Sequence, residues 1–204
     1  MRFLKLTMLY LVVALAISGC SKTMMSAYGI KKPRPINKDA IIQYAMKNNL
    51  PLADCYEIDT GYESFIRSFD TAQFRLQKKN HFQPLQALYF NRSGKLESFQ
   101  INCYAGGFPN LAWERDSILT TFPPKQQAPL DNILDLQTQL KYLKPLSGFP
   151  KDPLADYDYV VVVYWNHFMF RQTDRFLKFI KANASLAAGL NIKVIYANND
   201  NLYD

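Results

Sequence analysis

Cysteine and histidine are scarce in this chain of 204 residues, which holds three cysteines and two histidines. A histidine-rich metal site needs about three or four well-spaced ligands, and no such cluster surrounds His81 or His167. A glycine-rich phosphate loop is also missing, because Gly106 and Gly107 have no lysine partner and do not open a helix. The Gly-x-Ser-x-Gly motif of hydrolases does not occur. We therefore expect no metal and no cofactor, and the sequence favours a non-enzymatic protein without deciding the point.

Positive charge is modest and spread along the chain, with 24 Lys and Arg against 17 Asp and Glu. No expected helix carries a basic face interleaved with aromatic residues, so nucleic acid is not an expected partner. The one local basic cluster consists of Lys31, Lys32 and Arg34, in a segment that also contains Pro33 and Pro35. Such a segment is typical of a solvated linker stiffened by proline, and it is also suited to contact with anionic lipid head groups.

Long apolar runs are lacking as well. The longest, from Met8 to Ile17, is shorter than the roughly 20 residues that a membrane-spanning helix needs. It follows the basic residues Arg2 and Lys5 and precedes small residues and Cys20, which is the three-part layout of a secretory signal. We therefore expect export and removal of the amino-terminal segment.

The sequence Ile17-Ser18-Gly19-Cys20 resembles the lipobox of bacterial lipoproteins. The resemblance implies that Cys20 becomes the first mature residue and carries a diacylglycerol and fatty acyl chains such as palmitate, which together make membrane anchoring effectively permanent. Ser21 follows instead of an acidic residue, which in two-membrane bacteria implies sorting to the outer membrane. The expected organisation is a signal peptide at residues 1–19, a lipidated amino terminus and basic linker at residues 20–36, and a single α/β domain at residues 37–204.

If Cys20 carries lipid, the folded part holds only Cys55 and Cys103. An exported pair in an oxidising compartment can form a disulfide, and two buried free thiols fit the sequence equally well. These cysteines are the basis of the alternative function, a thiol-disulfide redox protein. The leading interpretation is a lipid-anchored cell-envelope protein that binds an envelope protein or a small ligand without catalysis.

The first two thirds of the domain contain several recognisable patterns. Asn37 stands where a helix N-cap should, and the apolar spacing after it predicts a helix that ends near Asn49. Two β-rich runs flank an Asn/Gly turn, which predicts a β-hairpin. We expect a helix over residues 59–79, a hairpin over residues 85–103, a structured aromatic loop over residues 104–124 and a helix over residues 129–146.

The last fifty residues predict a β-α-β unit. Residues 159–165 form a continuous run rich in valine, as in a strand buried on both faces. Residues 170–189 have an amphipathic helical pattern that ends in Gly189, and residues 191–200 predict a second strand. Two strands joined in this way should be parallel. The fold class we expect is α/β with a mixed sheet.

Residues 157–200 resemble the opening unit of thioredoxin-like proteins, in which a strand ending in an aromatic pair is followed by a short loop, a long helix and a second strand. Here that pair is Tyr164-Trp165. In the family, two redox cysteines begin the helix, but here those positions fall near Met169 and Gln172, so the usual thiolate chemistry is lost. The resemblance implies a thioredoxin-like core with altered strand order, in which the earlier hairpin replaces the one that normally follows.

Polar residues follow both strands of the β-α-β unit. Because ligands bind at the carboxyl ends of strands in open α/β sheets, His167, Asn198 and Asp200 are candidate ligand-binding residues, and a weaker hypothesis makes this place a hydrolase site. Turns favour the same residue types for backbone reasons alone. The aromatic loop is either an exposed recognition surface or a satellite of the core, formed by Tyr104, Phe108, Trp113 and Phe122.

Overall fold

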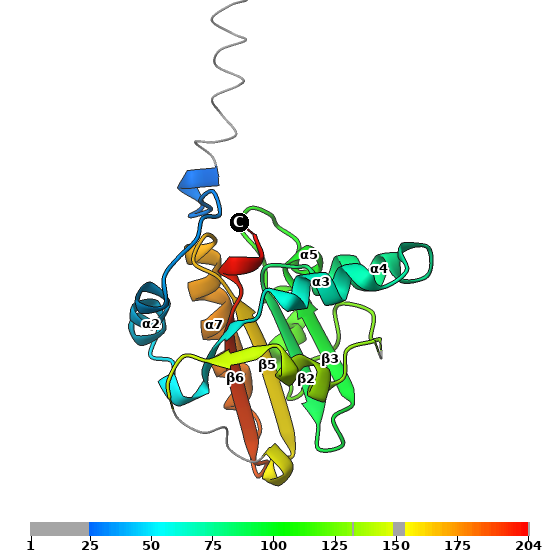
Figure 1. The fold of residues 1–204 in the computed structure, drawn as a ribbon. Coiled ribbons are helices and arrows are strands. Elements are labelled where there is room, and N and C mark those ends of the chain that lie inside the picture. The colour runs from blue at the N-terminus through cyan, green and yellow to red at the C-terminus, as the bar shows by residue number, and fades with distance from the viewer. Residues whose placement is uncertain (1–24, 132, 149–153, 204) are drawn as a thin grey trace, which may run out of the picture.

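The structure is a computed structural model that describes residues 25–131, 133–148 and 154–203. The expected signal peptide and Cys20 lie outside the described residues. The described part contains one open mixed sheet in the strand order β3-β2-β5-β6-β1-β4 (Figure 1). Its strands are β1 Cys55–Ile58, β2 Gln86–Asn91, β3 Leu96–Ile101, β4 Leu143–Pro145, β5 Tyr159–Trp165 and β6 Ile192–Asn198.

The centre of the sheet is parallel and its flanks are antiparallel. Strand β6 lies between β5 and β1 and is parallel to both. Strand β2 is antiparallel to β5 and to β3, and β4 is antiparallel to β1. The mixed α/β class, the hairpin and the parallel pair of the β-α-β unit are therefore confirmed. We call the side on which β1, β5 and β6 end the carboxyl edge, and the side on which they begin the amino edge.

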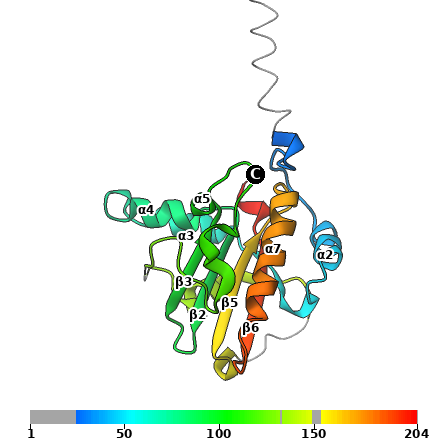
Figure 2. The same cartoon turned by 180° about the vertical axis from the view of Figure 1, so that it is seen from behind.

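Helices cover both faces of the sheet. Helices α2 (Lys38–Lys47) and α7 (Phe170–Ala184) lie on one face, where Tyr44 and Phe176 pack with Val161 (Figure 2). Helices α3 (Gly61–Ser68) and α6 (Leu136–Lys141) lie on the other face, where Tyr62 packs with Val162. Alternate residues of β5 thus enter two separate apolar clusters, which explains why its sequence is apolar throughout. Short helix α5 (Asn102–Ala105) extends β3 at the carboxyl edge.

The helix expected over residues 59–79 is wrong in extent, because the chain forms α3 and then α4 (Thr71–His81). Phe69 has extended backbone angles and ends the first helix. The Asp70 side chain then accepts a hydrogen bond from the backbone N–H of Ala72 at 2.8 Å and caps the second helix. A local capping signal therefore divides a segment whose apolar spacing alone is compatible with one helix.

The helix expected over residues 129–146 is also too long. Among the described residues of this segment the helix is α6, capped by Asp135, whose carboxylate accepts a hydrogen bond from the backbone N–H of Thr138 at 2.7 Å. The chain then turns into β4, which pairs with β1. Near the amino terminus of the domain, helix α2 is confirmed, with the Asn37 side chain accepting from the Ala40 N–H at 2.9 Å.

Helix α7 begins where it was expected but ends at Ala184 instead of near Gly189. Gly189 has a φ of +77° in the connection to β6, a conformation that glycine adopts without strain. Within the described ranges, no helix is both long enough and apolar enough to span a membrane.

Candidate functional site

The structure brings His167, Asn198 and Asp200 together at the carboxyl edge. The Asp200 carboxylate accepts hydrogen bonds from the backbone N–H of His167, at 3.0 and 2.7 Å to its two oxygens. The Asn198 side-chain amide donates to the same carboxylate at 2.7 Å. The convergence of these three residues after β5 and β6 follows from the parallel pairing of the two strands. The Asp200 carboxylate is therefore bound by the Asn198 side chain and by the His167 backbone, and the His167 imidazole takes no part in these bonds.

Asp200 is buried, with 2% of its surface exposed. Burial raises the pKa of its carboxyl group, while the hydrogen bonds from Asn198 and from the His167 backbone oppose that rise. The hydrogen bonds that the carboxylate accepts therefore connect the loop after β5 to the chain after β6. This is a structural role, and it leaves Asp200 without an open approach for a substrate.

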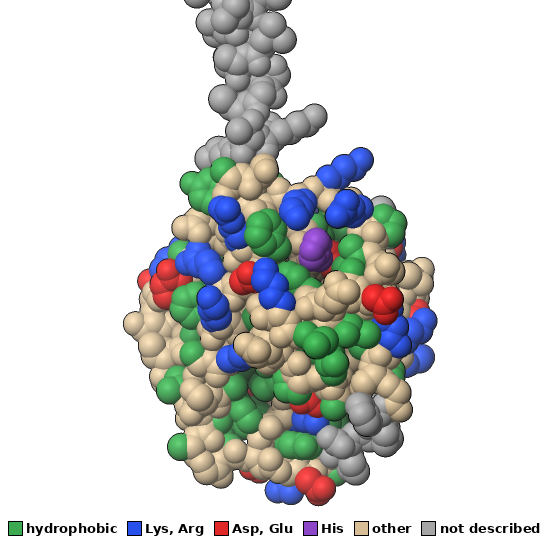
Figure 3. Space-filling view, turned by 90° about the vertical axis from the view of Figure 1, so that its left-hand side faces the viewer, with side chains coloured by type: hydrophobic (Ala, Val, Ile, Leu, Met, Phe, Trp, Pro, Cys, Tyr) green, Lys and Arg blue, Asp and Glu red, His purple; other side chains and the backbone are tan. Residues whose placement is uncertain are grey.

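The His167 ring is half-buried and lies edge-on to Tyr44, with 5.5 Å between ring centroids. Burial lowers the pKa of His167, and the neighbouring positive charges of Lys31 and Arg34 lower it further, although Asp200 acts in the opposite direction. Figure 3 shows Lys and Arg side chains gathered around a histidine in the upper half of the molecular surface that it draws. His167 is thus a half-buried group in a basic surrounding that favours the neutral imidazole.

Two further asparagines at the carboxyl edge were missed by the sequence analysis. The side chains of Asn166 and Asn199 both donate to the backbone carbonyl of Pro84, at 2.9 and 3.1 Å. Asn166 also accepts from the backbone N–H of Met169 at 2.9 Å. Pro84 lies just before β2, so these bonds hold three separate segments together. Only the strand order, with β2 beside β5, could have identified this contact in advance.

Met169 and Gln172, at the positions where thioredoxin-like proteins carry thiols, are buried with 3% and 2% of their surface exposed. The Gln172 side chain accepts a hydrogen bond from the backbone N–H of Leu111 at 3.1 Å and donates to the backbone carbonyl of Tyr28 at 3.4 Å. These residues therefore support packing at the start of α7, and they hold the aromatic loop and the amino-terminal segment against it.

The two cysteines of the domain do not meet. Cys55 lies in β1 and Cys103 follows β3, with strands β2, β5 and β6 between them, and both thiols are free. A disulfide requires Cα atoms within about 7 Å, so the pairing considered from the sequence does not fit this sheet. Burial is the main cause that raises the pKa of Cys55 to about 12, whereas Cys103 is exposed. Cys55 and Cys103 therefore do not form the pair of neighbouring thiols that the redox alternative needs.

The aromatic loop is mainly a satellite of the core. Trp113 is 1% exposed and lies against Phe176 of α7, with 4.3 Å between ring centroids. Tyr104 and Phe122 are half-buried and pack against the two apolar clusters. Phe108 alone of the four projects outward, with 61% of its surface exposed. A recognition surface made of all four rings is therefore not present.

His81 is a core residue. Its ring stacks on Phe99 with 4.9 Å between centroids, and its Nε2 lies 3.1 Å from a carboxylate oxygen of Asp131. Asp131 is thus the partner of this buried histidine. In the ranges that the structure describes, no group of three His, Cys, Asp or Glu side chains could hold a metal ion.

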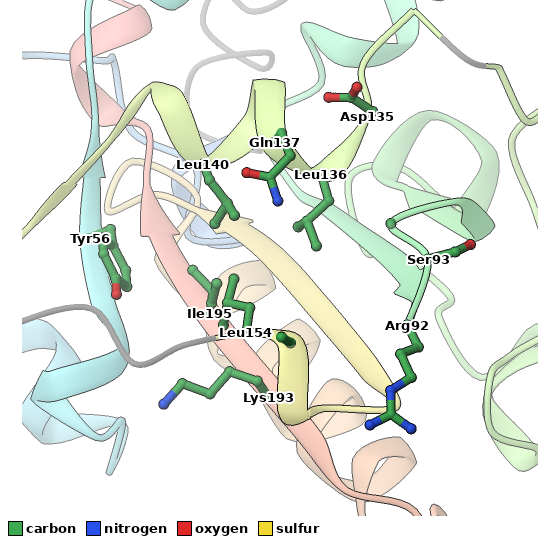
Figure 4. A pocket seen from close by; sticks show the side chains of 12 residues that line it. Tyr56, Arg92, Ser93, Asp135, Leu136, Gln137, Leu140, Leu154, Lys193 and Ile195 are labelled. Atoms are coloured by element: carbon green, nitrogen blue, oxygen red, sulfur yellow. The ribbon is translucent and has the colours of Figure 1, made fainter.

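A cavity of about 440 Å³ lies on the face of the sheet opposite α7, toward the amino edge. Figure 4 shows apolar side chains pointing into it, between Tyr56 on one side and Arg92 on the other. Volumes of this size are typical of sites for small molecules, which usually combine an apolar lining with a few polar groups. The apolar part of the lining includes Leu136, Leu140, Leu154, Ala155 and Ile195.

The two basic residues of the cavity have different surroundings. Lys193 forms an ion pair with Asp54 at 2.7 Å, and both side chains are largely buried. Arg92 is 67% exposed and lies 3.8 Å from Asp158, a long and solvated pairing that contributes little energy. The Arg92 guanidinium is therefore available to another carboxylate or sulfonate. No local sequence pattern indicates this cavity, because its lining comes from five separate segments.

Comparison with protein-family models, with curated protein sequences and with solved structures gives no significant match for this chain.

Proposed function

We propose that this chain is a lipid-anchored binding module of the cell envelope, attached through Cys20 to the outer membrane of a two-membrane bacterium. The amino-terminal sequence supports the anchor, since it combines a basic start, a short apolar run, small residues and a cysteine. Changing Cys20 to Ala should abolish fatty-acid labelling and release the protein from membranes. Retained labelling would contradict the anchor.

We further propose that the domain has a thioredoxin-like core with altered strand order. In this interpretation β5, α7 and β6 are the opening unit of the family. The hairpin of β2 and β3 precedes that unit in the sequence and takes the place of the hairpin that follows it in the family. The antiparallel pairing of β2 with β5, on the side away from β6, supports this assignment.

The observation that carries the proposal of a non-enzymatic role is the state of the start of α7. Met169 and Gln172 fill the positions of the family's thiols with buried, packed side chains, and Cys55 and Cys103 lie on opposite sides of β5. Thiol-disulfide exchange requires an accessible thiolate of lowered pKa with a partner thiol nearby. The geometry supports binding better than redox chemistry.

The cavity near Arg92 is the proposed binding site, and a small amphipathic molecule with an acidic group is the proposed ligand. Its apolar lining suits a hydrocarbon or ring, and the exposed guanidinium suits the acidic group. A protein partner is less well supported, because the six exposed large apolar residues of the described part are spread over five segments of the chain. They are Met46, Leu76, Phe108, Leu130, Leu186 and Leu190.

Two fluorescent dyes of similar shape test this site: anilinonaphthalene sulfonate, which is anionic, and N-phenylnaphthylamine, which is neutral. Ala155→Trp places a ring at the cavity rim and should weaken binding of both dyes. Arg92→Gln should weaken only the sulfonate, by roughly tenfold, the expected effect of one lost charged hydrogen bond. Leu186→Trp adds the same bulk at an exposed position outside the cavity and should change neither affinity. If each dye bound the unmodified protein and the three variants with the same affinity, the proposed site would be contradicted.

A further inference from the structure

The segment before α2, residues 25–36, packs on the domain. We call it the tether segment. The backbone N–H of Lys31 donates to the carbonyl of Phe168 at 2.7 Å, and the Arg171 guanidinium donates to the carbonyl of Ala27. Gly29 is buried against Arg171, where an added Cβ would lie 2.6 Å from the arginine Cγ. A segment expected to be a solvated spacer is therefore fixed to the loop after β5 and the first turn of α7.

This packing sets the place from which the chain leaves the domain. Phe168 and Arg171 both lie just beyond the end of β5, so the tether segment begins at the carboxyl edge (Figure 1). Five residue steps join Met25 to Cys20. At about 3.5 Å for each extended residue, they reach at most about 18 Å. A lipid on Cys20 would thus hold the carboxyl edge close to the membrane surface.

The same region of the molecule is basic. Residues 25–47 contain five basic side chains and one acidic side chain, Asp39. All five basic side chains are exposed, and within the described residues none forms an ion pair with a carboxylate; they are Lys31, Lys32, Arg34, Lys38 and Lys47. Toward the amino edge, by contrast, Lys193 forms a largely buried ion pair with Asp54.

Proximity and charge point to the same surface. An anionic bilayer attracts each nearby Lys or Arg enough to bias binding by roughly fivefold, and this attraction decays within a Debye length of about 10 Å at 0.1 M salt. Phe108, in the loop after α5, is an exposed aromatic ring. This loop lies against α7, because the Arg175 guanidinium donates to the side chain of Asn110, two residues after Phe108.

We propose that the carboxyl edge, with the tether segment and the start of α2, docks on an anionic lipid surface, so that the cavity near Arg92 faces away from the membrane. This orientation rests on the proposed anchor at Cys20. A free tether would let the domain rotate, whereas the packed tether segment and its unpaired charges select one orientation. The ligand site then opens toward the aqueous compartment.

Energy transfer from the domain to dye-labelled lipids measures this orientation. Cys103 lies at the carboxyl edge, because β3 runs in the same direction as β5, and it is the exposed thiol of the domain. Ala155→Cys in a Cys103→Ser protein provides a thiol near the amino edge. The seven residues of β5 separate the two edges by about 23 Å. Full-length lipidated protein in vesicles containing phosphatidylglycerol should transfer strongly from position 103 and weakly from position 155.

Charge reversal then identifies the cause. Lys32→Glu with Arg34→Glu should bring the transfer from the two positions close to equal, as should about 1 M salt or vesicles of phosphatidylcholine alone. Lys95→Glu with Lys178→Glu changes the net charge equally at positions outside the tether segment and α2, and should leave the difference intact.

The outcomes separate the two proposals. Fatty acid on Cys20 with equal transfer from both positions would overturn the orientation and leave the anchor standing. A protein without fatty acid would overturn the anchor, and the orientation with it. Unequal transfer in native membranes but not in the vesicles would assign the carboxyl edge to an envelope protein and overturn the lipid proposal.

Discussion

Trp113 is the residue on which the aromatic loop depends, and replacing it with Ala tests whether this loop belongs to the core. A buried tryptophan covers about 200 Å² of apolar surface, which at about 25 cal/mol per Å² corresponds to about 5 kcal/mol as an upper limit. Trp113 is 1% exposed and packs on Phe176. We therefore expect Trp113→Ala to lower the free energy of unfolding by about 3–5 kcal/mol.

Phe108→Ala is the matched control, because Phe108 belongs to the same loop and is 61% exposed. It should change the free energy of unfolding by less than about 0.5 kcal/mol. Denaturant titration followed by far-ultraviolet circular dichroism measures both variants on the same scale. Equal stability losses in the two variants, or none in Trp113→Ala, would refute the assignment of the loop to the core.

Three other predictions follow from single positions. Gly29→Ala should lower the thermal midpoint of unfolding more than Gly189→Ala. Both glycines have a positive φ, which costs an alanine about 1–2 kcal/mol, but only at Gly29 would the added Cβ also overlap an arginine side chain; equal shifts would contradict the packing of the tether segment. Burial and nearby cations lower the pKa of His167 below its usual value of about 6.5, so the unfolded chain binds more protons there and stability should fall as pH drops below about 6.5. His167→Gln should weaken this dependence of the free energy of unfolding on pH, measured by denaturant titration at several pH values. An unchanged dependence would contradict the role of His167. Alkylation of the folded protein should modify Cys103 and spare Cys55, whose burial raises its pKa to about 12; rapid modification of Cys55 would revive the redox alternative.

The elements with strong local patterns were predictable from the sequence. Strands β5 and β6, helix α7 and the hairpin have long apolar runs or a clear turn signal. The parallel pairing of β5 with β6 brings His167 and Asp200 to one edge. Strand β1 was missed because it has only four residues and its pairing partners are 85 or more residues away. Such a strand is defined by its neighbours in the sheet, which no local pattern reveals.

The roles of site residues were harder to predict than their positions. Asp200 and Asn198 converge as expected, but only the structure shows that they bond to each other and to backbone. The tether segment looked like a spacer because Pro33 and Pro35 stand among three basic residues. Its packing depends instead on Ile30, Ile36 and a glycine that fits against α7. The cavity near Arg92 joins five segments, so its lining becomes recognisable only after folding.

The intact mass of the mature protein, extracted from membranes without hydrolysis of lipids, tests the central claim most directly. The account predicts a chain that begins at Cys20, lacks residues 1–19 and carries the mass of a diacylglycerol and a further acyl chain. A chain that retains residues 1–19, or one that begins at another residue without added lipid, would contradict both the anchor and the orientation derived from it.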